Sequence, residues 1–158
     1  MRKPPDDPSI PRPGEGKRGE AGYLGYLLRQ AAGAYRHRMD RALADLDVTA
    51  PQFAVMTMLK AYPGISSADV ARLAILTPQT VSVIVSNLER AGTIRRLPHG
   101  IHGRILQIEL TPNGQSLLRR CRERVQALER EISEPLSETD QIIVRRWLVS
   151  VAKSESQN

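Results

Sequence analysis

The sequence predicts a mainly α-helical protein that carries one small β-hairpin. Apolar residues recur at intervals of three and four along most of the chain, which is the period of amphipathic helices. Only 4% of the residues are aromatic, so the core has to be built from aliphatic side chains packed between helices. Strand-like alternation of apolar and polar residues is confined to residues 94–110, on either side of a turn-rich tip.

Composition restricts the function. The 158 residues are enough for one ordinary globular domain, and a net charge of +6 with a pI near 10.0 indicates an anionic partner, either nucleic acid or a membrane surface. No apolar run approaches the roughly 18 residues of a membrane-spanning helix, and the N-terminus lacks the apolar core of a signal peptide, so we expect a cytoplasmic protein. Cys121 is the only cysteine, which excludes an internal disulfide and a cysteine-cluster metal site.

Residues 1–20 are predicted to be a disordered tail. Proline, glycine and charges of both signs dominate this segment, which has too few apolar side chains to offset the entropy of folding. Its acidic residues nearly balance its basic ones, so we expect a solvated tail rather than a DNA-binding arm.

Three helices are predicted between residues 22 and 76. The first covers residues 22–46, where apolar side chains keep helical spacing. A capping box over residues 49–52, with Pro51 in the first turn, opens the second helix, and the pair Pro63-Gly64 ends it. The third is short and begins at residues 66–67. Its side chains expected in the core are Val70, Leu73 and Leu76.

The fourth predicted helix has two different faces. Thr77 suits its N-cap, Pro78 its first position, and Gly92 the left-handed position just past its end. One face of the helix, called the front, carries small, polar side chains and almost no acidic residue. The apolar back, expected to pack on the body of the protein, consists of Val81, Ile84, Val85 and Leu88.

A basic β-hairpin is predicted directly after this helix. Residues 94–97 and 105–110 form two short strands joined by the tip PHGIHG. From residue 77 to residue 104 the chain has four arginines against the single acid Glu89. The arginines on the hairpin are Arg95, Arg96 and Arg104.

Two more helices are predicted after the hairpin. Thr111 caps the first, and a box over residues 137–140 opens the second. Together with the first helix of the chain, they carry more apolar surface than a small domain can cover, so we expect a second subunit to cover it. The apolar stripe of the first of the two runs through Leu117, Cys121, Val125, Leu128 and Ile132.

A short helix, a tight turn, a helix with a polar front and a basic hairpin together form a winged helix-turn-helix. In such a unit the second helix fits the major groove, and the arginines of the hairpin suit phosphates and the narrow minor groove. We assign residues 49–111 to this DNA-binding domain and residues 21–48 and 112–155 to a helical dimerisation region.

The order of these motifs resembles the MarR family of bacterial transcription regulators. The resemblance runs from Leu24 to Lys153 and rests on LDVTAPQFAVMTML, SSADVARLAILTPQTVSVIVSNLERAGTIRR, HGR and LTPNG. It implies a homodimer that binds a pseudo-palindromic operator and releases it when a small aromatic compound or an oxidant arrives. We therefore expect a repressor whose partners are double-stranded DNA, a second copy of the chain and a small aromatic effector, with no cofactor.

The chain departs from the family pattern in two places. Many relatives carry arginines in the recognition helix where Val83 and Asn87 stand here. Many also carry an aspartate, which commonly braces the wing arginine, where this chain has His102 before Gly103 and Arg104. The operator of a relative therefore cannot be transferred to this protein.

We predict DNA-contacting side chains on the front of the fourth helix and on the hairpin. Polar side chains of the helix suit base edges or phosphates, Asn87 suits adenine, and Val83 suits a thymine methyl group; the alternative is that some only solvate the helix. A basic hairpin has little structural reason to exist, whereas arginine gains from the negative potential of the minor groove. The predicted set is Gln79, Thr80, Ser82, Val83, Ser86, Asn87, Arg95, Arg96 and Arg104.

The remaining reactive residues are assigned to the structure rather than to chemistry. Among His37, His99 and His102 only the loop pair has metal-ligand spacing, and two loop histidines alone rarely make a site. Cys121 is expected to be a buried, inert thiol. No nucleophile with a nearby base, carboxylate pair or glycine-rich phosphate loop supports an enzyme. Tyrosine and methionine side chains of the first helix, with Met56, either border an effector cleft or pack in the core or dimer.

The alternative function is a winged-helix protein-interaction module without specific DNA readout. Salt discriminates between the two, because binding to phosphates weakens steeply as salt rises and binding through an apolar face does not. The sequence leaves open the operator, the regulated genes, the effector and the choice between repression and activation.

Overall fold

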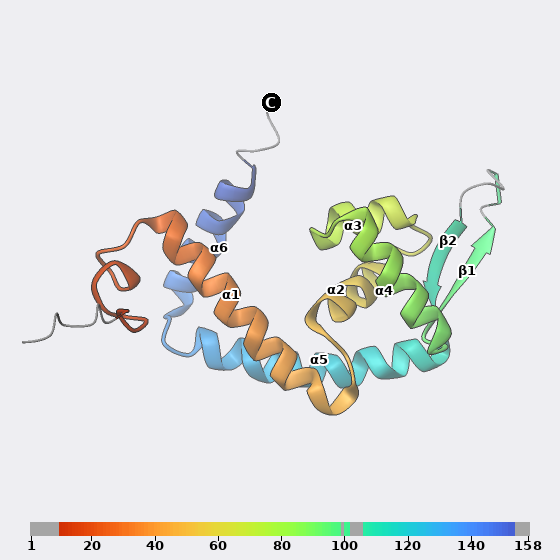
Figure 1. Ribbon diagram of the computed structural model, residues 1–158, viewed down its shortest axis with the longest axis horizontal. Helices are drawn as coiled ribbons and strands as arrows, with labels where there is room; N and C mark the ends of the chain where they lie inside the picture. Colours follow the sequence, from red (N-terminus) through yellow and green to blue (C-terminus); the bar gives the residue numbers. More distant parts are fainter. Residues whose placement is uncertain (1–9, 99, 102–105, 154–158) are drawn as a thin grey trace, which may run out of the picture. The chain divides into compact units, whose positions relative to one another are not determined.

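The computed structural model describes residues 10–98, 100–101 and 106–153 (Figure 1). The chain divides after Arg38 into two compact units, which are described separately. The first unit contains the 3₁₀ turn η1 (Gly16–Arg18) and most of α1 (Leu24–Leu43); the second contains the end of α1 and every later element. These later elements are η2 (Ala44–Leu46), α2 (Ala50–Ala61), α3 (Ser67–Ala74), α4 (Pro78–Arg90), β1 (Ile94–Pro98), β2 (Leu106–Leu110), α5 (Pro112–Ser133) and α6 (Glu138–Lys153).

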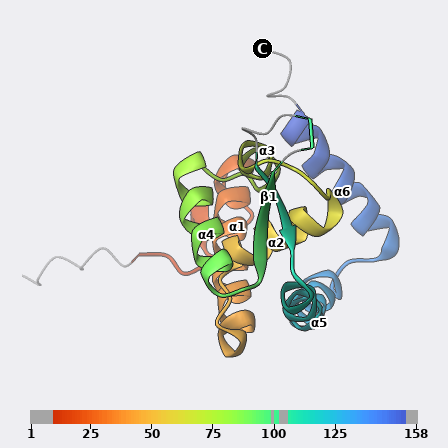
Figure 2. The same cartoon turned by 90° about the vertical axis from the view of Figure 1, so that its right-hand side faces the viewer.

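The two strands form an antiparallel hairpin (Figure 2). Ile94 lies opposite Leu110 at its base, and Pro98 lies opposite Leu106 at the described end. The backbone N–H of Ile108 also donates to the carbonyl oxygen of Ile65 at 3.3 Å, so the segment before α3 is tied to the outer side of β2. A mainly helical chain with a single described hairpin confirms the predicted fold class.

Residues 10–20 have a defined conformation in the first unit, although their composition predicts a disordered tail. Arg18 donates through Nε to Gln30 Oε1 at 3.1 Å, and Gln30 Nε2 donates to the Arg18 carbonyl oxygen at 3.1 Å. A further guanidinium nitrogen of Arg18 donates to the Pro11 carbonyl oxygen at 2.8 Å. Polar contacts hold this segment, and low apolar content reveals only the lack of a hydrophobic core. Residues 1–9 lie outside the described residues.

The predicted caps explain where the helices begin. Thr49 and Gln52 form the capping box of α2, and Ser66 and Asp69 form that of α3. The Ser66 hydroxyl, followed by the Arg72 guanidinium, stabilises the ionised carboxylate and holds the pKa of Asp69 below its ordinary value. The capped turn is therefore fully formed above that ordinary pKa and weakens as pH falls through the lowered one.

The core of the second unit is made of aliphatic side chains from its helices and both strands. One prediction about it was wrong, because Leu73 is 39% exposed. On α5 the buried leucines are Leu118 and Leu128, and Leu117 is half-buried. In the short α3 only Val70 and Ala71 face inward. The largest fully buried side chains are Leu43, Val55, Met56, Val70, Val81, Val85, Ile108, Leu118 and Cys121.

The last helix buries none of its side chains. Its apolar residues face outward even though they follow a helical period, which is the pattern of a surface that a further chain covers. The exposed large apolar side chains of α6 are Ile142, Ile143, Val144, Trp147, Leu148, Val149 and Val151.

Within the described residues, no single helix is both long and apolar enough to cross a membrane. Only α3 and α4 taken together reach that length and composition, and this pair is bent by 112°.

Candidate DNA-binding interface

The helix α4 is divided lengthwise into a buried back and an exposed front. Its four predicted core residues are buried, and Val81 and Val85 have no exposed surface at all. Thr77 caps the helix by accepting from the Thr80 backbone N–H at 3.2 Å. Of the predicted front, Gln79, Thr80, Ser82, Val83 and Asn87 are exposed and Ser86 is half-buried.

Some side chains of this front already have partners within α4. The hydroxyl oxygens of Thr77 and Thr80 lie 2.9 Å apart, and Arg90 donates to Asn87 Oδ1 over a long 3.5 Å. In the described part of the chain, Gln79 and Ser82 make no such side-chain hydrogen bond. The apolar Val83 lies on the same front with 60% of its surface exposed.

The turn between α3 and α4 depends on an unusual residue. Ile75 adopts the left-handed conformation, with φ of 56°, and its N–H donates to the carbonyl oxygens of Ala71 and Arg72. The next amide, that of Leu76, donates to the Ala71 carbonyl oxygen at 3.0 Å. Sequence patterns did not reveal this position, because glycine or asparagine is the usual residue there.

The hairpin arginines have carboxylate partners. Arg95 lies opposite Glu109 in the strand register and forms an ion pair and a hydrogen bond with it. The Arg96 Nε lies 3.5 Å from Glu89 Oε2, which is an ion pair without a hydrogen bond, so this buried nitrogen has no hydrogen-bond partner among the described residues. The expectation that a basic hairpin has little structural reason to exist is therefore wrong for this pair of arginines.

The base of the hairpin is fixed to α4 and α5. The buried Thr93 donates through Oγ1 to the Leu88 carbonyl oxygen at 2.7 Å, and its own carbonyl oxygen accepts from the Thr111 N–H at 3.0 Å. Thr111 Oγ1 donates to the Gly92 carbonyl oxygen at 2.7 Å and also caps α5. A Cβ atom on Gly114 would lie 1.9 Å from the Thr93 carbonyl oxygen, so only glycine fits there.

The tip of the hairpin is not described by the structure. His99 and residues 102–105, which include Arg104, lie outside the described residues. The placement of Arg104 therefore stays a prediction from the sequence.

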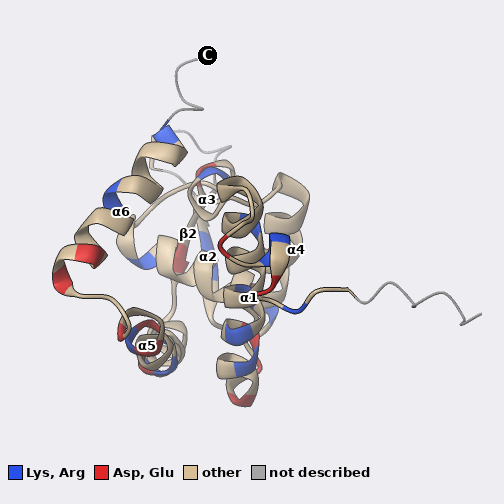
Figure 3. Cartoon of the chain, turned by 90° about the vertical axis from the view of Figure 1, so that its left-hand side faces the viewer, with Lys and Arg blue, Asp and Glu red and all other residues tan. Residues whose placement is uncertain are grey.

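Metal-ligating side chains and the single cysteine are further candidates for a site within the described chain. No group of three metal-ligating side chains occurs among the described residues. Cys121 is fully buried as predicted, and burial raises the pKa of its thiol. The charges of α5 are mixed in sign (Figure 3), whereas Glu89 is the one acid in residues 77–98.

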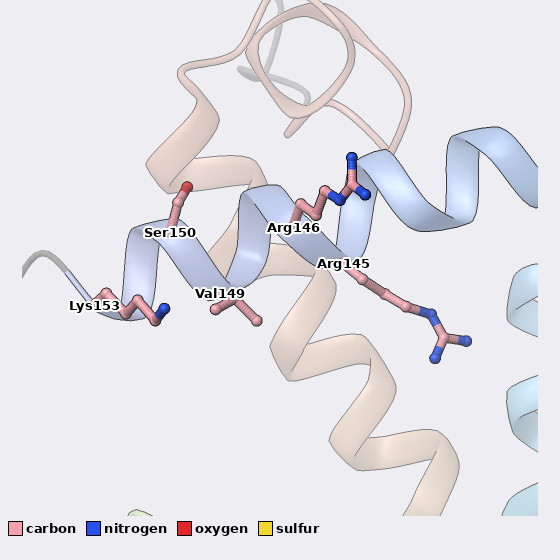
Figure 4. A pocket seen from close by; sticks show the side chains of 5 residues that line it. All are labelled: Arg145, Arg146, Val149, Ser150 and Lys153. Atoms are coloured by element: carbon pink, nitrogen blue, oxygen red, sulfur yellow. The ribbon is translucent and has the colours of Figure 1, made fainter.

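A recess of about 380 Å³ lies along α6 (Figure 4). It is lined by Arg145, Arg146, Val149, Ser150 and Lys153, all from one helix. The two arginine side chains diverge from each other, so they do not converge on a common ligand.

Comparison with known proteins agrees with this architecture. Residues 46–105 match the MarR family. The HTH-type transcriptional repressor Rv2887 of Mycobacterium tuberculosis is 35% identical over 125 residues, which cover 79% of this chain and 90% of the relative. Its crystal structure with salicylic acid covers 84% of this chain and 98% of that one, with a TM-score of 0.68 and 33% identity.

A structure solved with DNA is also similar. The MepR–DNA complex of Staphylococcus aureus has a TM-score of 0.77 and 26% identity over 84% of this chain and 98% of that one. The family is identified by the relative that is 35% identical, and the buried back of α4 and the hairpin that follows it agree with this assignment. The chain belongs to the MarR family of winged helix-turn-helix transcription regulators.

Proposed function

We propose that the protein is a dimeric, sequence-specific DNA-binding repressor that a small aromatic ligand releases from its operator. The observation that carries this proposal is the division of α4, whose buried back anchors a small, polar and exposed front. A helix of this form fits the major groove. The similar MepR structure, which is a DNA complex, supports the same use of the fold.

The proposed DNA contacts fall into two groups. Gln79, Ser82 and Val83 meet base edges, because they are exposed and make no side-chain hydrogen bond among the described residues. Thr80, Ser86 and Asn87 complete the helix surface as phosphate or water-mediated contacts. The arginines of the hairpin, Arg95, Arg96 and Arg104, contact the neighbouring backbone or minor groove.

We assign residues 49–111 to DNA binding, and residues 21–48 and 112–155 to dimerisation. The outward-facing apolar side chains of α6 support this division, because a second copy of the chain would remove them from water. A two-fold dimer would place two copies of α4 about 34 Å apart, one turn of DNA. The proposal includes a cytoplasmic location, where the DNA lies, and no catalytic activity.

The proposed effector is an aromatic acid. Rv2887, which is 33% identical over its structure, was solved with salicylic acid and, in a second structure, with p-aminosalicylic acid. We propose that this chain accepts a ligand of the same class.

Fluorescence anisotropy tests the proposal. The protein is titrated onto a duplex from the DNA upstream of its own gene and onto a shuffled duplex, at two salt concentrations, with and without salicylate. We expect tighter binding to the native duplex, weakening with salt and with salicylate, and a uniform loss for Arg104→Ala on every duplex. Equal affinity for both duplexes across a set of genomic fragments would contradict sequence-specific binding and favour the protein-interaction module.

A further inference from the structure

The middle of α4 carries short, uncharged side chains on the front that we propose for DNA binding. Residues 78–89 contain no lysine or arginine. The only basic residue of α4 is Arg90, which stands at the end of the helix and donates to Asn87. Arginine and lysine make the commonest specific contact with guanine, through its O6 and N7 atoms. The part of α4 that lies deepest in a groove therefore lacks the usual side chains for reading guanine.

Val83 stands out within this surface. It is 60% exposed, while Val81 and Val85 on either side are completely buried. A β-branched residue is less favourable in a helix than alanine, and the exposed part of Val83 gains no packing within the chain to offset that cost. Its immediate neighbour on the front, Ser82, is short, which lets the helix approach the bases closely.

Gln79 lies one turn before Val83 on the same face of α4. Four residues correspond to about 6 Å along the helix axis, or about two base-pair steps of DNA. Glutamine suits the N6 and N7 atoms of adenine, and an apolar side chain suits the C5 methyl group of thymine.

We infer that α4 reads A·T base pairs in the major groove, with Val83 against a thymine methyl group and Gln79 on an adenine within about two base pairs of it. This inference rests on the proposed DNA-binding function and specifies its target. Single exposed apolar side chains are common on protein surfaces. The decisive test therefore has to address the methyl group itself.

The experiment replaces each thymine of the preferred duplex in turn by deoxyuridine, which removes the C5 methyl group and keeps the hydrogen-bonding edges. Full-length wild-type protein and Val83→Ala are titrated onto each duplex by anisotropy. For the wild type we expect one thymine in each half-site at which the substitution weakens binding about four-fold, the equivalent of one apolar carbon group. Val83→Ala is expected to bind the unmodified duplex more weakly and to be insensitive to deoxyuridine at that thymine.

Folding does not confound this variant, because alanine is the better helix former at an exposed position; circular dichroism and thermal unfolding check it. Deoxyuridine outside the half-sites serves as the matched DNA control and should change nothing. Wild-type binding that is insensitive at every thymine, or a Val83→Ala protein that keeps the wild-type sensitivity, would overturn the methyl contact while leaving the repressor proposal intact. Binding that never prefers any duplex over its shuffled form would overturn both.

Discussion

The front of α4 and the hairpin behind it are both predicted to contact DNA, yet their side chains are in different states. Gln79 and Ser82 on α4 make no side-chain hydrogen bond in the described part of the chain, whereas Arg95 and Arg96 on β1 have carboxylate partners. The front of the helix has little charge, but these two side chains are available for hydrogen bonds to DNA. The hairpin arginines are charged, but carboxylates already partly neutralise them. Counting arginines therefore overestimates the positive charge that this hairpin offers to phosphates.

The strand register explains this difference. Glu109 lies 14 residues after Arg95 in the sequence and directly opposite it in the hairpin. An exposed pair of this kind stabilises the fold by only about 0.2–1 kcal/mol, so a DNA phosphate competes with it readily. If Arg95 binds a phosphate, breaking the pair therefore costs the DNA affinity no more than this amount.

The largest expected effect is that of Gly114→Ala, which alters the base of the hairpin. The new Cβ would lie 1.9 Å from the Thr93 carbonyl oxygen, so the base of the hairpin must shift while the exposed front of α4 keeps its residues. We expect a loss of about 3 kcal/mol in the free energy of unfolding, measured by urea denaturation, with weaker DNA binding. Gly33→Ala is the control, since nothing lies within 4 Å of its added Cβ and alanine favours the helix. Equal stability of the two variants would contradict the close packing.

Gln79→Ala tests the exposed front of α4. A lost base contact should weaken binding to the preferred duplex by about 1–2 kcal/mol and leave binding to a shuffled duplex unchanged. Parallel anisotropy titrations on both duplexes measure the ratio. A uniform loss on both would show that Gln79 contacts phosphate instead of bases.

Glu109→Gln tests whether the ion pair of Arg95 limits DNA binding by the hairpin. Releasing Arg95 should tighten binding about three- to five-fold on every duplex, and should steepen the slope of log affinity against log salt by about 0.9. Glu20→Gln changes the net charge equally at an exposed site in the first unit and controls for long-range charge. If the two variants bind DNA equally tightly, release of Arg95 is not the cause of the tighter binding.

The smallest expected effect concerns the turn that connects α3 to α4. Ile75→Gly removes a left-handed isoleucine whose side chain is 91% exposed. Relief of about 1–2 kcal/mol of strain, partly offset by the greater entropy of glycine in the unfolded chain, should stabilise the protein by about 0.5 kcal/mol. Thermal unfolding and anisotropy together should show a higher Tm with unchanged DNA affinity. A lower Tm would mean that this side chain packs against something.

Helix ends and faces were largely predictable from the sequence. Thr49, Ser66, Thr77 and Thr111 cap their helices as predicted, and the buried back of α4 follows its helical period. Capping and amphipathic spacing are local properties, since they involve residues within one or two turns. The same locality explains the failures. The short α3 turns Leu73 outward, and Arg18 and Gln30, which lie twelve residues apart in the sequence, are joined by hydrogen bonds that local patterns do not reveal.

The order of the elements, their caps, the apolar back of α4 and the likeness to MarR regulators could all be predicted from the sequence, because each depends on residues close together in the chain. The folded structure was needed to show that Arg95 pairs with Glu109, that Arg96 pairs with Glu89, and that Gly114 leaves room for the Thr93 carbonyl oxygen. These contacts depend on the strand register and on the packing of separate elements. Both are set by many residues acting together and not by a local pattern. Local spacing therefore identifies the surface that we propose for DNA binding, and long-range pairing decides how much of its charge is available.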